Sequence, residues 1–94
     1  MNPREKILYK VSGRVQGVCF RAYAEAAAAE LGVTGWIRNR ADGRVEGEAW
    51  GSEEAIKAFI QWLHKGSPYG RVDAVEVERE GPDEHAPPSF GTRY

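Results

Sequence analysis

Nine residues near the start of the chain combine the features of an anion-binding site. Residues 13–21 read GRVQGVCFR, in which Gly13 and Gly17 allow a tight turn and a close approach of backbone N–H groups to a ligand. A strongly helix-forming sequence follows, and a helix N-terminus offers unpaired N–H groups and the positive end of the helix dipole. Arg21 adds a permanent charge whose planar guanidinium matches phosphate oxygens. We therefore predict a site for a phosphate-like group.

Other interpretations of these residues are weaker. Without the glycine loop, Arg21 would be interpreted as an ordinary surface arginine at the start of a helix. An arginine there opposes the helix dipole, a cost that a bound anion relieves. Cys19 as a thiolate nucleophile would need an arginine several residues downstream, whereas Arg21 is two residues away on the expected helix. The glycine spacing matches neither a Walker loop nor a dinucleotide fingerprint. His64 and His85 lack partners at metal-ligand spacing, so we expect surface positions and no metal site.

Length and composition bound the class of protein. Ninety-four residues predict a single domain over residues 1–94. No apolar run approaches a membrane span, and residues 1–6 are not followed by the apolar segment of a signal peptide. One cysteine excludes an internal disulfide, which fits a cytoplasmic location. Residues 1–45 hold eight basic and four acidic residues, against five and ten in the remainder. This asymmetry favours a small anionic substrate over nucleic acid.

The pattern along the chain predicts an alternation of strands and helices. Residues 6–12 alternate as a strand, residues 22–31 form an alanine-rich helix that stops at Gly32, and residues 34–40 and 45–50 form strands joined at an Asp-Gly hairpin signal. Ser52 caps a second helix. Its amphipathic stripe consists of Ile56, Phe59, Ile60 and Leu63. Residues 72–80 form a fourth strand, and residues 90–94 a short edge strand.

This order predicts an α+β, ferredoxin-like β-α-β-β-α-β sandwich. Two helices with apolar stripes bury them most simply on one face of an antiparallel sheet, with the core strand order 4-1-3-2. The first and second strands then run parallel, so their C-terminal ends share one edge. Two strand spacings separate them by about 10 Å. Arg21, which follows the first strand, and Asn39, at the end of the second, can therefore both reach a small ligand across this gap. Taken alone, Asn39 is more typical of a strand-end residue that hydrogen-bonds its own turn.

The chain resembles the acylphosphatase family over essentially its whole length. Residues 13–21 look like the family's first signature, and residues 35–46, GWIRNRADGRVE, look like its second. The resemblance implies hydrolysis of a carboxylic-phosphoric anhydride to a carboxylate and inorganic phosphate, without a metal or other cofactor. It also implies that Asn39 orients the attacking water, and that Arg21 binds the phosphate together with backbone N–H groups of Arg14, Val15, Gln16, Gly17, Val18, Cys19 and Phe20.

That chemistry suits these residue types. Phosphoryl transfer needs positioning and charge stabilisation more than covalent catalysis. The leaving carboxylate is the conjugate base of an acid with a pKa of about 4, so it departs without a general acid. A neutral Asn39 that holds water in line is then sufficient, and Arg21 keeps its charge at any working pH.

The alternative is a binding module without turnover. Ferredoxin-like sheets also serve RNA-recognition domains, which stack bases on exposed aromatic residues, and Trp36 and Trp50 are candidates here. Residues 44–51 lack the aromatic-glycine motif of those domains, however. A module that binds a phosphorylated small molecule is the other form of this alternative. For the enzyme we expect a monomer, with a small acyl phosphate as substrate and inorganic phosphate as product.

Overall fold

The computed structural model describes residues 4–94. Its helices and strands follow the predicted order: β1 (Arg4–Arg14), α1 (Phe20–Leu31), β2 (Thr34–Asn39), β3 (Val45–Gly51), α2 (Glu53–Lys65), β4 (Arg71–Asp83) and β5 (Phe90–Thr92).

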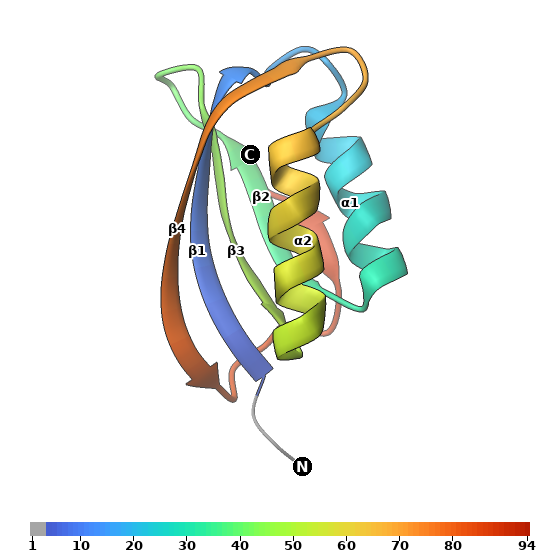
Figure 1. Cartoon of the computed structure of the whole chain (residues 1–94), viewed down its shortest axis with the longest axis vertical. Helices are drawn as coiled ribbons and strands as arrows, with labels where there is room; N and C mark the ends of the chain where they lie inside the picture. Colours follow the sequence, from blue (N-terminus) through green and yellow to red (C-terminus); the bar gives the residue numbers. More distant parts are fainter. Residues whose placement is uncertain (1–3) are drawn as a thin grey trace.

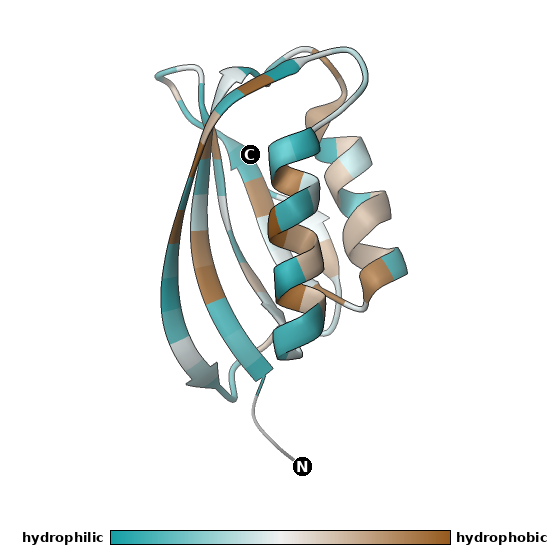
Figure 2. Cartoon of the chain, viewed as in Figure 1, coloured by the Kyte–Doolittle hydropathy of each residue, from teal (hydrophilic) through white to brown (hydrophobic). Residues whose placement is uncertain are grey.

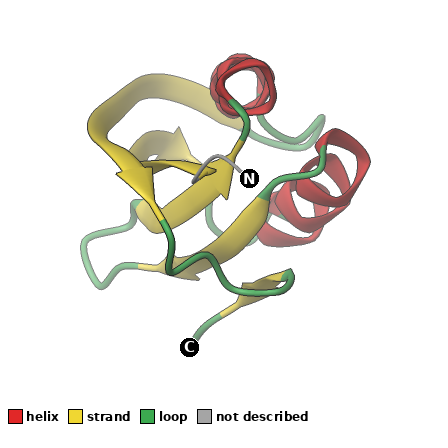
Figure 3. Cartoon of the chain, turned by 90° about the horizontal axis from the view of Figure 1, so that it is seen from below, coloured by secondary structure: helices red, strands yellow, loops and turns green. Residues whose placement is uncertain are grey.

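The strands form one sheet in the order β4-β1-β3-β2-β5. β1 pairs antiparallel with β3 and β4, and β2 pairs antiparallel with β3. Both helices cover the same face of the sheet (Figures 1 and 3). The predicted ferredoxin-like fold and the core order 4-1-3-2 are therefore confirmed. β5 adds a parallel pair with β2, which makes the complete sheet mixed rather than purely antiparallel.

The core lies between the helices and the sheet. β1 contributes Ile7, Tyr9 and Val11 on its inner face, and teal and brown bands alternate along this strand in Figure 2. The stripe of α2 is buried as predicted, except that Ile60 lies at the margin. Full burial of one such large apolar side chain stabilises the fold by about 1.5–3 kcal/mol. This packing fixes the helices on the sheet and, with them, the start of α1.

Several boundaries differ from the prediction: β1, α1 and β4 are longer than predicted, and β2 and β5 are shorter. β1 continues to Arg14 through a register shift between Ser12 and Gly13, so the strand includes the start of the glycine segment. α1 begins at Phe20, two residues before the predicted start. β4 extends to Asp83, where it pairs with the first residues of β1. β2 ends at Asn39 and β5 at Thr92, each slightly short of the prediction.

Three loops meet at one end of the molecule. They connect β1 to α1, β2 to β3, and α2 to β4, and Figure 1 shows all three at the upper end. Within residues 4–94, neither helix has the length and apolar character needed to cross a membrane. The upper end therefore gathers the segments that carry the predicted site.

Candidate active site

The loop between β1 and α1 has the backbone shape of an anion cradle. Gly17 has φ 72°, and Cys19 has φ 60° and ψ 22°, both in the left-handed region. Phe20 then starts the right-handed α1. Neighbouring left- and right-handed residues turn successive N–H groups toward one concave space, an arrangement that binds anions in many proteins. The loop therefore contains a left-handed cysteine in addition to the predicted glycine.

The N–H groups of this loop are available to a ligand. Tyr23 is the first residue of the helix whose N–H reaches a carbonyl, that of Cys19 at 3.1 Å. Within residues 4–94, the N–H groups of residues 17–22 find no acceptor. Buried or constrained N–H groups are strong donors that are normally paired, so such a run favours an external anion.

Ser67, in the loop between α2 and β4, orients part of the cradle. Its buried hydroxyl donates a hydrogen bond of 2.7 Å to the carbonyl oxygen of Val18. In a trans peptide the carbonyl and the following N–H point in opposite directions. The N–H of Cys19 is therefore turned away from Ser67.

Arg21 is the second residue of α1 and its charge adds to the helix dipole. The first turn of α1 holds no acidic residue. Among the described residues, no carboxylate lies within ion-pairing distance of the Arg21 guanidinium. The guanidinium lies instead over the ring of Tyr94, 5.1 Å from its centre. The start of α1 is thus a concentrated positive site.

Asn39 is the last residue of β2, and its side chain is exposed. It lines the same pocket as Arg21, a hollow of about 330 Å³. The predicted residues at this pocket are Val15, Gly17, Cys19, Phe20, Arg21 and Asn39. The other three predicted residues do not line it: Arg14 pairs with Arg71 in the sheet, Val18 is buried, and Gln16 turns to the β2–β3 hairpin.

The C-terminal residues also line this pocket, although the sequence pattern does not predict them there. The parallel pairing of β5 with β2 brings Thr92 and Tyr94 beside Asn39. Thr92 donates a hydrogen bond of 2.7 Å to Glu25, another lining residue on α1. Glu25 is thereby held against β5. Nothing in the periodicity of residues 90–94 indicates which strand they join, so this wall of the pocket carries no local signal.

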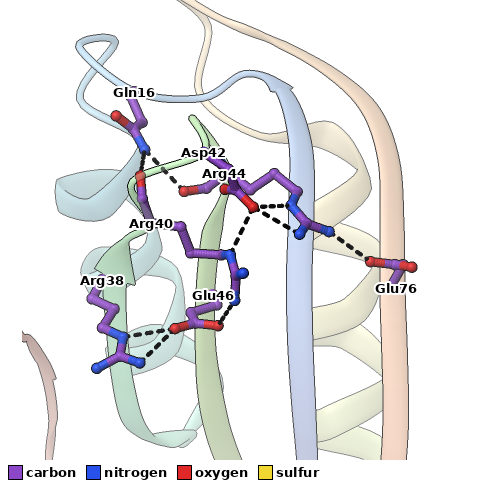
Figure 4. Close-up of polar contacts among 7 residues, drawn as sticks. All are labelled: Gln16, Arg38, Arg40, Asp42, Arg44, Glu46 and Glu76. Atoms are coloured by element: carbon purple, nitrogen blue, oxygen red, sulfur yellow. Dashed lines mark hydrogen bonds and ion pairs between the residues drawn. The ribbon is translucent and has the colours of Figure 1, made fainter.

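The hairpin that follows Asn39 is braced by ion pairs (Figure 4). The Glu46 carboxylate forms ion pairs with the guanidinium groups of Arg38 and Arg40, each with an N–O distance of 2.7 Å. The Asp42 carboxylate forms ion pairs with Arg40 and Arg44, at 3.0 and 2.8 Å. Partial burial would raise the pKa of Glu46, but the hydrogen bonds from both arginines outweigh it and lower this pKa. Hydrogen bonds from the Arg44 side chain and backbone likewise lower the pKa of Asp42, well below its ordinary value. The hairpin carboxylates are therefore ionised and paired.

The tryptophan side chains and the possible metal ligands bear on two alternatives, an RNA-binding module and a metal-dependent site. Trp50 is almost fully buried and its indole N–H bonds Asp83 at 3.1 Å, so it offers no exposed stacking face. Trp36 carries Arg93 and Arg38 over its ring, at 4.6 and 5.3 Å. In the described part of the chain, no cluster of three or more His, Cys, Asp and Glu side chains has the arrangement of a metal site.

Comparison with known proteins identifies the family of the chain. The family model described as Acylphosphatase matches residues 7–91. An acylphosphatase of Anaeromyxobacter dehalogenans is 51% identical over 78 residues, covering 83% of this chain and 84% of that protein. Acylphosphatase-2 of Bos taurus is 44% identical over 79 residues, covering 83% and 80%. The crystal structure of acylphosphatase from Bacillus subtilis superposes with a TM-score of 0.90 at 36% identity, covering 96% of this chain and 99% of that one. The chain therefore belongs to the acylphosphatase family.

Proposed function

We propose that this chain hydrolyses acyl phosphates in the pocket between α1, β2 and the C-terminal residues. In this proposal Arg21 and the N–H groups of the β1–α1 loop bind the phosphoryl group, and Asn39 positions the attacking water. The hydrolase activity follows from membership of the acylphosphatase family. The assignment of roles rests on one observation, that Arg21, the loop and Asn39 line the same pocket.

The phosphoryl group is held by charge and by directed donors. The N–H groups of Gly17 and residues 19–22, together with the guanidinium of Arg21, supply donors on one side of the pocket. A phosphoryl group in transfer spreads negative charge over its equatorial oxygens, and donors already in place stabilise that charge without reorganisation. Because no carboxylate of residues 4–94 forms an ion pair with Arg21, its guanidinium is available to contact the substrate.

Asn39 faces the phosphoryl group from the end of β2. Its amide can accept a hydrogen bond from water through the oxygen, which aims a lone pair of that water at phosphorus. A loose transition state demands little nucleophilicity from the water, so a neutral amide is sufficient. The acyl carboxylate leaves on the opposite side with its electron pair, and a phosphoryl oxygen takes the proton released by the water. Positioning of this kind contributes large rate factors.

We propose that residues 1–94 form one domain that acts as a cytoplasmic monomer, with inorganic phosphate as a bound product and with no cofactor or nucleic-acid partner. The Arg21 charge and the loop N–H groups suit free phosphate as well as the substrate. Sedimentation of the purified protein measures the oligomeric state directly.

The proposal is tested by hydrolysis of benzoyl phosphate, with calorimetric titration of inorganic phosphate. Arg21→Ala should lose about 100-fold or more in kcat/KM and should also lose phosphate affinity, because it removes charge stabilisation. Asn39→Ala should lose a similar factor in kcat but keep phosphate affinity. Arg79→Ala, at an exposed arginine on β4, is the matched control and should behave as wild type.

The outcomes separate the readings of the site. Full activity of folded Arg21→Ala would remove its proposed role. Loss of phosphate binding in Asn39→Ala would make Asn39 a phosphate ligand. Binding of phosphate without turnover by the wild type would favour a binding module. The assay is repeated with a chelator, and inhibition that added metal reverses would contradict a metal-free reaction.

A further inference from the structure

We infer that Gln16 is a positioning residue whose side chain holds the β2–β3 hairpin, and with it Asn39, in place against the anion cradle. The inference rests on the proposed function, because it concerns how Asn39 and the cradle come to face one substrate. In the proposed function, residues 14–20 bind phosphate through backbone N–H groups only. The Gln16 side chain therefore has no role there.

The contact itself is a double hydrogen bond. Nε2 of Gln16 donates to the carbonyl oxygen of Arg40 at 2.8 Å and to that of Arg44 at 2.9 Å (Figure 4). Both partners are carbonyl oxygens, so only the NH₂ end of the amide can face them. Its two hydrogens match the two acceptors. The Gln16 side chain is half-buried, which shields these bonds from competing water.

The partner carbonyls belong to the turn of the hairpin. Arg40 N–H donates to the Arg44 carbonyl at 2.7 Å, and Gly43 N–H donates to the Arg40 carbonyl at 3.3 Å. Gln16 therefore bonds the two oxygens that already close the turn. These are backbone atoms, so the contact depends on the shape of the turn and not on the arginine side chains.

This contact links two segments that the sheet alone keeps apart. Gln16 immediately precedes Gly17, the first left-handed residue of the cradle, while Arg40 immediately follows Asn39. β1 and β2 are not neighbours, because β3 lies between them. The Gln16 side chain is the direct bridge from the cradle to the end of β2. It thus sets the separation between the site for phosphate and the amide that positions water.

Loss of the bridge should affect the two halves of the site unequally. Arg21, the N–H groups of the cradle and the Ser67 contact to Val18 do not involve the Gln16 side chain, so phosphate affinity should persist. Asn39 would lose its support against the cradle, and a displacement of about 1 Å costs up to roughly 100-fold in rate. Folding should also persist, since each carbonyl keeps its backbone donor.

The test compares Gln16→Met with Gln61→Met. Methionine keeps the length of glutamine but donates no hydrogen bond, and Gln61 is exposed on α2, so it controls for the substitution itself. With benzoyl phosphate, Gln16→Met should lower kcat by about 10- to 100-fold. Its KM and its calorimetric affinity for inorganic phosphate should stay within about threefold of wild type. Gln61→Met should match wild type in all three.

A double-mutant cycle shows whether Gln16 acts through Asn39. In the Asn39→Ala background, Gln16→Met should cause little further loss of kcat, because the group it positions is gone. NMR provides a readout independent of turnover. In Gln16→Met, the Asn39 side-chain amide and the backbone amides of residues 40–44 should shift or broaden, while phosphate-induced shifts of residues 17–22 should remain.

Several results would overturn the inference. These are an unchanged kcat, an equal loss of kcat in both backgrounds, unchanged NMR signals of residues 39–44, or a Gln16→Met protein that does not fold. Loss of phosphate affinity alone would assign Gln16 to the cradle instead. If the wild type does not hydrolyse benzoyl phosphate, the proposed function fails, and the NMR comparison still decides whether Gln16 holds the hairpin.

Discussion

Cys19 shapes the candidate site through its backbone rather than its thiol. Its left-handed conformation, φ 60°, directs the chain into α1 and is rare for a residue with a Cβ. Such a conformation costs on the order of 1 kcal/mol, which the surrounding structure must supply. The bond from Ser67 to the preceding carbonyl is one such restraint. The exposed thiol itself makes no hydrogen bond to residues 4–94.

A series of substitutions at Cys19 separates the two roles. Cys19→Gly and Cys19→Ser should keep hydrolytic activity, since glycine tolerates the conformation and serine resembles cysteine. Cys19→Val should weaken phosphate binding by about threefold, because a β-branched residue is disfavoured in this region more strongly than cysteine. Calorimetry with inorganic phosphate and the benzoyl phosphate assay measure both. A folded but inactive Cys19→Ser protein would instead support the thiolate nucleophile.

At the scale of elements, the placement of β2 depends on a contact that crosses β3. The hydroxyl of Tyr9, on β1, donates a hydrogen bond of 2.8 Å to the carbonyl of Trp36, on β2. Gly47 of β3 lies between them, and a Cβ there would collide with both the Trp36 carbonyl oxygen and the Tyr9 hydroxyl. Burial raises the pKa of Tyr9 well above its ordinary value, so this hydroxyl stays a donor. A glycine in the middle of a strand thus lets β1 hold the strand that ends at Asn39.

Gly47→Ala should therefore destabilise the protein. The added methyl group has no free space, and overpacking of this kind typically costs about 1–3 kcal/mol. Urea unfolding followed by circular dichroism measures the change. Gly91→Ala, in β5, is the matched control, because a Cβ there meets nothing within 4 Å. Equal stability of the two variants would show that the Tyr9 contact can be rearranged at no cost.

At the scale of the whole molecule, paired carboxylates make stability depend on pH. Hydrogen bonds from Arg44 lower the pKa of Asp42. The hydrogen bonds from Arg40 and Arg38 lower that of Glu46 against the opposing effect of burial. Burial would raise the pKa of Glu48 too, but hydrogen bonds from Lys6 and Trp36 outweigh this effect and lower the pKa. The unfolded chain therefore binds more protons in acid than the folded one, and stability falls as pH falls.

The free energy of unfolding should accordingly be nearly constant between pH 7 and about pH 5. It should decrease below about pH 4, as the unfolded carboxylates take up protons and then as the folded ones do. Urea titrations at several pH values measure it. Glu46→Gln should reduce the dependence on pH in acid. Glu84→Gln, at an exposed carboxylate without an ion pair within residues 4–94, should not, and an identical effect of both would contradict the role of the hairpin network.

Much of the fold could be predicted because its signals are local. The alternation of β1, the stripe of α2, the Ser52 cap and the stop of α1 at Gly32 each depend on residues within a few positions of one another. The order of these elements leaves few compact topologies, and the observed core order is the expected one. The family and the two segments that carry Arg21 and Asn39 could also be recognised from short stretches of sequence.

The set of elements, their topology and the residue types offered to an anion therefore follow from the order of the residues alone. The support of those residues depends on contacts between distant segments of the folded chain. The Gln16 bonds to the hairpin join residues 24 and 28 positions apart, the Ser67 bond spans 49, and the Thr92 bond to Glu25 spans 67. Hydrophobic periodicity cannot predict contacts over such sequence separations. It indicates which face of an element a residue occupies, but not which distant segment packs against that face. Those meetings depend on the backbone path of the complete sheet and its loops.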